Sequence, residues 1–370
     1  MGTVWLSKLV ATTMLVAVLG LLAEAQIEAK FKCISENATC HALADYSHPN
    51  GTTLRRIQTL FTVKHLPDIL GANNLPANTT RVAPDQVIKV PFPCRCSNGT
   101  GLSNKVPRYK IKKGDTLYDI ATTVFAGLVK YPQIQVANEI PDANNITAGD
   151  TIWIPLPCSC DAVAGSSVVH YAHLVQDGSS VESIAQEYGS TQQILLSLNG
   201  ISDPKLLQAR QLLDVPLQAC SSSVKNDSPD YPLLVPNATY VYTAKECVKC
   251  KCDSSNNFRL QCEPSQHKPI NDWSVCPSME CSKNVLIGNT TSTDSCNRTI
   301  CDYAGYSNSK ISTILATQNT CAVPPSGSGT SSGSGSGDSG SGASRSNLHG
   351  WVWSSPLIVI HFLLFVVFLL

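Results

Sequence analysis

A unit of about sixty residues occurs three times along the chain, and this repeat restricts the fold more than any other feature. Each unit closes with a short aliphatic or β-branched run that ends at a proline and is followed by a cysteine within five residues; the runs are 87–91, 151–155 and 212–216. The prolines lie 64 and 61 residues apart. Such a period indicates tandem modules, each with a small core.

The middle unit shows its order of elements most clearly. It begins with a strand pattern, turns at Gly114, and enters a helix for which Thr116 is a suitable N-cap and Asp119 occupies the capping-box position. The apolar residues that follow have helical spacing: Leu117, Ile120, Ala121, Val124 and Phe125. Pro132 can open a second helix, and a loop over 139–149 leads to the closing strand. The predicted order is β-α-α-β.

The other two units repeat this order less regularly. In the third unit Gly178 marks the turn, and Ser179 with Glu182 forms the predicted capping box. In the first unit mainly helical spacing remains, at Leu54, Ile57, Leu60, Phe61, Leu66, Ile69 and Leu70. We therefore predict modules over 26–96, which is divergent, 97–160 and 161–220.

The charge balance excludes some classes of function. The 370 residues contain 27 Lys and Arg and 27 Asp and Glu, so the formal net charge is zero and no nucleic-acid partner is expected. The eight histidines are scattered, and residues 221–322 are rich in cysteine without a recognisable active-site motif. We expect no enzyme activity, no cofactor and no metal. A cell-wall glycan hydrolase is the less favoured alternative, because it needs two carboxylates across a cleft.

Both ends of the chain carry targeting patterns. Residues 1–25 have a basic residue, an apolar run and a small-x-small site, as in a secretory signal peptide; an uncleaved anchor is the alternative. A Ser- and Gly-rich stalk over 323–342 precedes an apolar tail over 343–370. This pattern predicts attachment of a glycosylphosphatidylinositol (GPI) lipid at Ser341 or Gly342, with a transmembrane tail as the alternative.

The cysteines and glycosylation sequons agree with a secreted chain. All 16 cysteines lie between Cys33 and Cys321, which favours disulfides over a zinc cluster at Cys247, Cys250 and Cys252. The two Cys-x-Cys pairs stand at module junctions, where adjacent cysteines reach different partners more easily than each other. Nine Asn-x-Ser/Thr sequons are N-glycosylation candidates: Asn37, Asn50, Asn78, Asn98, Asn145, Asn226, Asn237, Asn289 and Asn297.

The middle unit resembles a LysM module. The resemblance rests on Tyr-x-Ile-x-x-Gly-Asp-Thr-Leu-x-x-Ile-Ala at 109–121, on Asn138 and on the strand that ends at Pro155. Three such units joined by Cys-x-Cys pairs are similar to plant LysM receptors. When the Cys-rich block and the anchor signal are included, the whole arrangement is similar to the chitin elicitor-binding protein group. The implied fold class is α+β: three disulfide-stapled βααβ LysM modules, then a Cys-rich, mostly β or irregular domain over 221–322.

The resemblance also implies a set of disulfides. In the family pattern Cys33 would pair with Cys96, Cys40 with Cys160 and Cys94 with Cys158. Ten cysteines then remain from Cys220 onward, so complete pairing requires Cys220 to bond into the C-terminal block.

A ligand groove is implied between two loops of the middle module. In LysM folds it lies between the first strand–helix loop and the loop before the last strand, and it binds N-acetylglucosamine polymers. The corresponding residues are Gly114, Asp115, Thr116, Leu117 and Tyr118, and Pro141, Asp142, Ala143, Asn144 and Ile146. We expect Ile146 to form the apolar floor and the first and third modules, which lack Gly-Asp-Thr, to be scaffolding. The sequon at Asn145 lies inside the second loop.

These features predict a pattern-recognition receptor of innate immunity on the outer face of the plasma membrane. It would bind chitin oligosaccharides, form ligand-induced homodimers and pass the signal to a transmembrane LysM receptor-like kinase as co-receptor. A peptidoglycan receptor is the nearest alternative, because that glycan also contains N-acetylglucosamine.

Overall fold

The computed structural model describes residues 31–319, except 271–272, 282–284 and 293–296. All of the described residues fall within one compact unit. The predicted signal peptide, the stalk and the anchor signal with Ser341 and Gly342 lie outside them. Every helix in the described part is shorter or less apolar than a membrane span requires.

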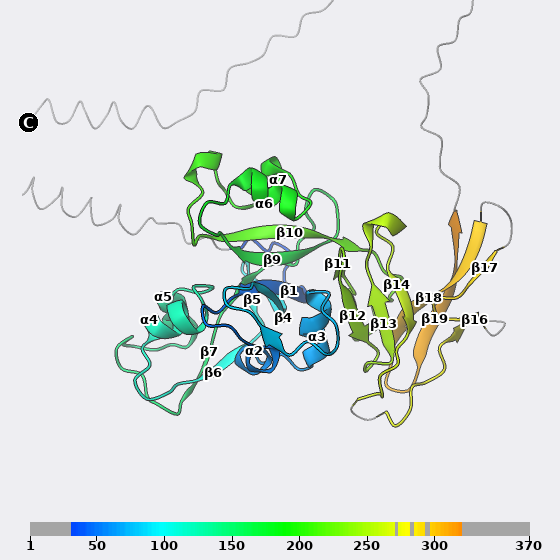
Figure 1. Cartoon of the computed structure of the whole chain (residues 1–370), viewed down its shortest axis with the longest axis horizontal. Helices are drawn as coiled ribbons and strands as arrows, with labels where there is room; N and C mark the ends of the chain where they lie inside the picture. Colours follow the sequence, from blue (N-terminus) through cyan, green and yellow to red (C-terminus); the bar gives the residue numbers. More distant parts are fainter. Residues whose placement is uncertain (1–30, 271–272, 282–284, 293–296, 320–370) are drawn as a thin grey trace, which may run out of the picture. The chain divides into compact units, whose positions relative to one another are not determined.

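Strands from all three modules form one mixed sheet (Figure 1). β1 is its central strand: it runs antiparallel to β4, with Cys40 opposite Cys94, and parallel to β9, with Leu43 opposite Tyr171. The order is β11-β10-β9-β1-β4-β5-β8, with β1 Thr39–Tyr46, β4 Ile88–Ser97, β5 Thr100–Ser103, β8 Pro157–Cys158, β9 Val168–Leu174, β10 Leu212–Cys220 and β11 Val235–Pro236. The middle module also has a separate pair, β6 Arg108–Lys110 and β7 Thr151–Trp153.

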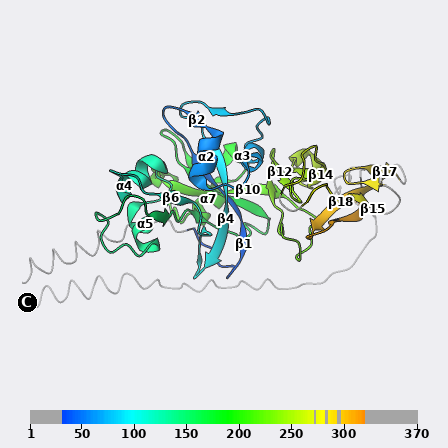
Figure 2. The same cartoon turned by 90° about the horizontal axis from the view of Figure 1, so that it is seen from below.

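Two short helical segments lie between the strands of each module, as predicted. They are α2 Leu54–Phe61 and α3 Leu66–Ala72; α4 Leu117–Asp119, continued by the π-helix η1 Ile120–Val124, and α5 Tyr131–Ala137; α6 Val181–Glu187 and α7 Gln192–Leu198. Figure 1 shows α6 and α7 on one side of β9 and β10, and Figure 2 shows α4 and α5 near β6. The loops contain β2 Thr52–Thr53, β3 Arg81–Val82 and the 3-10 helix η2 Pro204–Leu206.

The predicted capping box of the third module was wrong by one residue. Ser180, not Ser179, caps α6: its hydroxyl accepts a hydrogen bond from the Ser183 amide at 3.1 Å, and the Ser183 hydroxyl accepts one from the Ser180 amide at 2.9 Å. Ser179 completes the preceding turn, because its amide donates to the Gln176 carbonyl at 3.1 Å. In the middle module Thr116 is the N-cap, as predicted.

Aromatic rings join the cores of the first and second modules. Phe61 lies between Tyr46 and Phe125, with ring centroids 5.2 and 5.6 Å away, and Phe125 lies 5.9 Å from Tyr109. All four side chains are buried and belong to one hydrophobic cluster, whereas the third module has a separate cluster that includes Tyr171. The first two modules therefore depend on each other for burial of apolar area.

Three disulfides join the cysteines that the family resemblance implies: Cys33–Cys96, Cys40–Cys160 and Cys94–Cys158. The bonded cysteines are 63, 120 and 64 residues apart in sequence. In the chain-entropy account each bond restricts the unfolded chain by roughly 3–5 kcal/mol. The cysteines of each Cys-x-Cys pair thus bond to different partners, as predicted.

Four more disulfides hold the Cys-rich domain: Cys220–Cys252, Cys247–Cys276, Cys250–Cys262 and Cys281–Cys301. Cys220 is therefore bonded into the C-terminal block, as the cysteine count requires. The zinc alternative is wrong, because its three cysteines are all oxidised and offer no thiolate to a metal. Cys296 and Cys321 lie outside the described residues.

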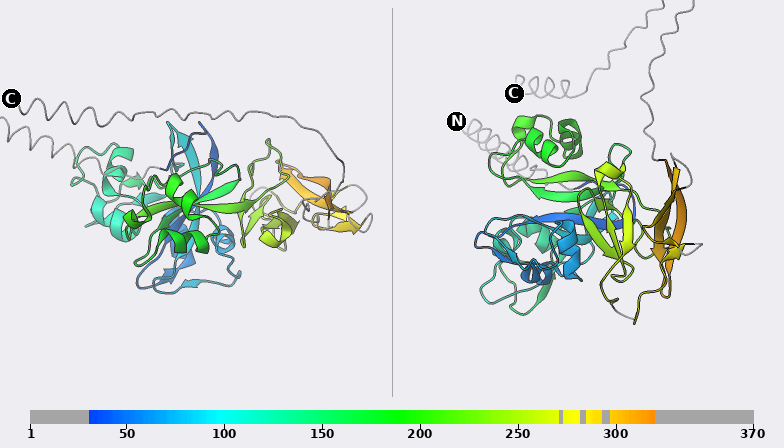
Figure 3. Two further views of the ribbon diagram at one scale, coloured as in Figure 1. Left: turned by 90° about the horizontal axis from the view of Figure 1, so that it is seen from above. Right: turned by 45° about the vertical axis from the view of Figure 1, so that its right-hand side comes forward.

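The Cys-rich domain is mostly β, as predicted. Its elements are β12 Tyr240–Thr243, β13 Val248–Lys251, the 3-10 helix η3 Ser254–Asn256, β14 Gln261–Pro264, β15 Glu280–Cys281, β16 Val285–Leu286, β17 Thr290–Ser292, β18 Asn297–Tyr306 and β19 Ile311–Asn319. The last two form the long orange pair in Figure 3. The Tyr240 hydroxyl donates to the Leu75 carbonyl of the first module at 2.7 Å. A Cβ at Gly71 would lie 2.1 Å from the Tyr240 carbonyl oxygen, so this contact requires glycine.

An asparagine fastens the second helix of every module to its closing strand. Asn138 donates through its amide to the carbonyls of Ile134 at 2.8 Å and Trp153 at 2.7 Å, and its own carbonyl accepts from the Trp153 amide at 2.8 Å. Asn73 and Asn199 make the same three bonds in their modules. Each asparagine side chain thus pairs with the amide and the carbonyl of one strand residue, as a neighbouring strand would. The strand is β4 for Asn73, β7 for Asn138 and β10 for Asn199.

We predict that Asn138→Ala destabilises the ectodomain by several kcal/mol, because the amide and the carbonyl of Trp153 both lose their partner, and an unpaired buried group costs about 1–3 kcal/mol. Denaturant unfolding of the oxidised ectodomain measures the change. Asn144→Ala, at an exposed asparagine of the same module, is the matched control and should leave the midpoint almost unchanged. Equal midpoints for the two variants would contradict the role of Asn138.

Candidate functional site

The strand pair β6–β7 brings the two predicted loops of the middle module to one end of the module. Lys110, the last residue of β6, lies opposite Thr151, the first residue of β7. Two further bonds extend the pair: the Ile111 amide donates to the Asp150 carbonyl at 2.9 Å, and the Gly149 amide donates to the Ile111 carbonyl at 2.8 Å. The segment after β6 and the segment before β7 therefore start side by side.

The first loop is a turn fixed by Asp115. One oxygen of its carboxylate accepts from the Tyr109 hydroxyl and from the Lys112 amide, both at 2.8 Å. Gly114 has φ of +91°, a conformation that side chains disfavour. Burial, and then the hydrogen bond from its hydroxyl to Asp115, raise the pKa of Tyr109 to about 12. Asp115 thus holds the shape of the loop.

The second loop is held at its start and folded on itself. The Gln135 amide group donates to the Ile140 carbonyl at 3.1 Å. The Asp142 carboxylate accepts from the Asn144 amide at 2.9 Å, and the Asn145 amide donates to the Asp142 carbonyl at 3.0 Å. Ile146 is half-buried and packs against the core shared with the first module.

The predicted site residues differ in how much of each reaches the surface. Gly114, Thr116, Tyr118, Pro141, Asp142 and Asn144 are exposed, and Asp115, Ala143 and Ile146 are half-buried. Leu117 is the exception, because its side chain is only 1% exposed and belongs to the core. Any contribution of Leu117 to ligand binding has to come from its backbone. The sequon residue Asn145 is exposed in the same loop.

Tyr131 is a surface residue beside the loops that the sequence reasoning missed. Its ring centroid lies 6.4 Å from that of Tyr118 in an edge-to-face arrangement. Tyr118 is 61% exposed and Tyr131 40% exposed, so the pair presents aromatic surface to solvent. Tyr131 is the first residue of α5 and stands outside the buried stripe. An aromatic residue outside a core stripe is the signal that could have identified it.

The first module has the same loops in a closed form. Its β2 and β3 pair, with Thr52 opposite Val82, and the Leu54 amide donates to the Thr80 carbonyl at 3.0 Å. In the middle module, by contrast, segments 114–118 and 141–146 make no backbone hydrogen bond to each other. In the first module, therefore, backbone groups of the two loops are already hydrogen-bonded to each other and are not available to a sugar.

The third module is open but has different side chains. Its loops are joined only at the base, where the Val175 amide donates to the Gln211 carbonyl at 2.9 Å and the Arg210 amide to the Val175 carbonyl at 2.8 Å. Glu182 and Gln192 occupy the places of Tyr118 and Tyr131. The exposed aromatic pair therefore belongs to the middle module.

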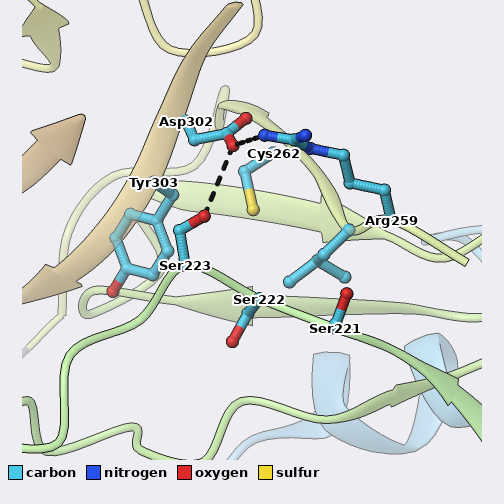
Figure 4. A pocket seen from close by; sticks show the side chains of 8 residues that line it. Ser221, Ser222, Ser223, Arg259, Cys262, Asp302 and Tyr303 are labelled. Atoms are coloured by element: carbon cyan, nitrogen blue, oxygen red, sulfur yellow. Dashed lines mark hydrogen bonds and ion pairs between the residues drawn. The ribbon is translucent and has the colours of Figure 1, made fainter. Parts of the chain in front are cut away.

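Two other features of the described chain are poor candidates for a site. A cavity in the Cys-rich domain is lined by Ser223, Arg259 and Asp302, with an ion pair between Arg259 and Asp302 (Figure 4). Its volume of about 10 Å³ holds no more than a water molecule. Clusters of possible metal ligands in the described chain consist only of disulfide-bonded cysteines: Cys33, Cys40, Cys94, Cys96 and Cys160.

Comparison with known proteins agrees with the module geometry. The LysM domain model matches residues 109–155 and 173–216, the second and third modules. LysM domain-containing GPI-anchored protein 2 of Arabidopsis thaliana is 50% identical over 293 residues, which cover 78% of this chain and 82% of the relative. The chain belongs to the plant LysM domain-containing GPI-anchored proteins.

Two more relatives of this LysM protein carry informative names. The Chitin elicitor-binding protein of Oryza sativa subsp. japonica is 40% identical over 348 residues, which cover 92% of this chain and 91% of the relative. Chitin elicitor receptor kinase 1 of Arabidopsis thaliana is 29% identical over 167 residues, which cover 43% of this chain and 27% of the kinase. The names of the Arabidopsis GPI-anchored relative and of the rice relative describe an anchored protein and a binding protein, whereas the third relative is named as a kinase.

Proposed function

We propose that this LysM protein is a cell-surface receptor for chitin oligomers and binds them at the two open loops of the middle module. The observation that carries the proposal is the difference between modules: the first is closed by β2–β3, whereas the second is open and flanked by Tyr118 and Tyr131. The relative named for chitin elicitor binding supports the ligand class.

The chemistry of the loops suits a neutral acetylated sugar. Several loop amides donate no hydrogen bond in the described chain, among them those of Gly114, Thr116, Ala143 and Ile146. Such amides can donate to the acetamide carbonyl of a sugar, and its methyl group can pack on the half-buried Ala143 and Ile146 side chains. The exposed rings offer stacking surface to the pyranose faces.

We predict that Ile146→Glu abolishes chitin binding while the ectodomain stays folded. A carboxylate at the apolar floor has to be desolvated by the ligand, whereas in the free protein a half-buried side chain can turn to solvent. Titration calorimetry with a chitin oligomer should show at least a tenfold loss, about 1.4 kcal/mol.

The matched control for this variant is Leu207→Glu. Leu207 is the corresponding half-buried residue of the third module, so the control carries the same burial and charge change. It should bind as the wild type does. If Leu207→Glu loses binding and Ile146→Glu keeps it, the site lies in the third module.

Tyr131→Ala should weaken binding without loss of stability. Removal of one stacking ring costs about 0.5–1.5 kcal/mol beyond the area it buries, up to about a tenfold change in Kd. Tyr231→Ala is the control, since Tyr231 is 53% exposed in the part of the chain that follows the modules. Unchanged affinity of Tyr131→Ala would remove the ring from the site.

Signalling requires a partner, because a GPI anchor is confined to the outer leaflet. We propose that lipid attachment at Ser341 or Gly342 holds the ectodomain at the plasma membrane. A LysM receptor-like kinase then carries the signal inward. The relative named as a chitin elicitor receptor kinase shares part of this sequence, which supports a partner of the same module type.

Long oligomers should assemble two receptors. A shallow site of this kind reaches micromolar affinity, about 8 kcal/mol, and one long chain gains avidity by occupying two sites. Sedimentation of the ectodomain should show dimers with a chitin octamer and monomers with a tetramer. Equal behaviour with both would exclude bridging, and stronger competition by peptidoglycan fragments would identify that glycan as the ligand.

A further inference from the structure

A cavity of about 280 Å³ lies where the first module, the third module and the Cys-rich domain meet. The first module contributes the end of α3 and the start of β4, and the third contributes Tyr171 and the end of α6. The remaining wall is the turn between β11 and β12, residues 237–239. Small-molecule sites begin at roughly 300 Å³, so the cavity has room for one small group.

The three residues of one glycosylation sequon form that turn wall. Asn237, Ala238 and Thr239 all line the cavity, and Asn237 is exposed. The Asn237 side-chain carbonyl accepts from the Ser254 amide at 2.8 Å, and its backbone amide donates to the Gln218 carbonyl at 3.0 Å. Its Nδ2, the atom to which an N-linked glycan attaches, makes no hydrogen bond in the described chain. The side chain is thus fixed with the attachment atom available.

The opposite wall contains the Lys89 ammonium, which has no hydrogen-bond acceptor among the described residues. The Lys89 ammonium lies 5.6 Å from the Tyr171 ring centroid and 5.4 Å from the Tyr188 ring centroid, which is cation–π geometry. It donates no hydrogen bond to any described residue. Burial lowers the pKa of Lys89, and the nearby Asp45 and Glu187 carboxylates act in the opposite sense. A partly buried ammonium with three unused donors favours a neighbour that supplies oxygen acceptors.

The wall also has features that suit a sugar. Glu187 and Tyr188 are consecutive residues, and both line the cavity. The Tyr188 ring is half-buried and offers an apolar face, and the exposed Asn74 adds a polar group. A pyranose presents C–H groups on its face and hydroxyl and acetamide oxygens at its edge. The C–H face of the sugar can therefore pack on the Tyr188 ring, and its oxygens can accept hydrogen bonds from the Lys89 ammonium and the Asn74 side-chain amide.

We propose that the glycan on Asn237 folds back and that its first N-acetylglucosamine fills this cavity, linking the Cys-rich domain to the first and third modules. The sugar lies against Tyr188, and its oxygens accept hydrogen bonds from Lys89. Because the sugar is attached to the chain itself, it fills the cavity whether or not the protein has bound a soluble oligomer. The proposal is independent of the chitin site.

Covalent acylation of Lys89 in the native ectodomain, produced in a plant secretory host, tests the proposal. Peptide mapping should find Asn237 glycosylated and Lys89 protected, both in the intact glycoprotein and after an endoglycosidase has trimmed the glycans to their first sugar. Asn237→Gln should increase acylation of Lys89 severalfold and leave the exposed Lys130 unchanged. It should also lower Tm, by roughly 2–4 °C.

Asn226→Gln is the matched control, because Asn226 is an exposed sequon that does not line the cavity. It should change neither Lys89 acylation nor Tm. The proposal is overturned if Asn237 carries no glycan, or if Asn237→Gln leaves Lys89 as protected as the wild type. Exposure of Lys89 upon trimming would show that the first sugar is not the occupant. Protection of Lys89 in Asn237→Gln by soluble chitobiose alone would assign the cavity to a free ligand instead.

Discussion

Three disulfides at the meeting point of β1, β4 and the end of the second module are the constraint on which the remaining structure depends. The helices of the modules are at most eight residues long, and such segments are not stable in isolation. Their packing against short strands becomes stable because Cys40 and Cys94 hold β1 and β4 to Cys160 and Cys158. The loops that we assign to chitin belong to the module that these bonds hold in place.

The modules have the same fold but different surfaces. In the first module the strand pair β2–β3 uses the backbone groups of both loops, and its α3 packs against Tyr240 of the Cys-rich domain. The second module shares its core with the first through Phe61 and Phe125, which leaves its loop end open to solvent. This difference supports our proposal that the first module is structural and that the second binds the ligand.

Local patterns in the sequence predicted much of this fold, because the physical causes are local. Thr116 is recognisable as an N-cap from its own neighbours, and the helical spacing after it depends on residues within eight positions. The same reasoning placed the third cap at Ser179, one residue early, since two adjacent serines fit the pattern and only the turn hydrogen bond of Ser179 to Gln176 decides between them.

Other features depend on contacts between distant segments, which no local pattern contains. The parallel pairing of Leu43 with Tyr171 and the closure of the first module by β2–β3 are of this kind. In the candidate site, the sequence predicted both loops and put Leu117 both in the apolar helix stripe and among the groove residues; its side chain is 1% exposed and belongs to the core. Tyr131 was overlooked because it approaches Tyr118 only in the folded module.

The order in which the cysteines pair has a consequence for biosynthesis. Cys33 and Cys40 enter the secretory compartment first and lie seven residues apart, yet neither bonds to the other. Cys40 has to remain reduced, or exchange its partner, until Cys160 has been translated 120 residues later. Oxidation in strict order of synthesis would join Cys33 to Cys40, so the native pairs require either delayed oxidation or thiol–disulfide exchange after the second module has emerged.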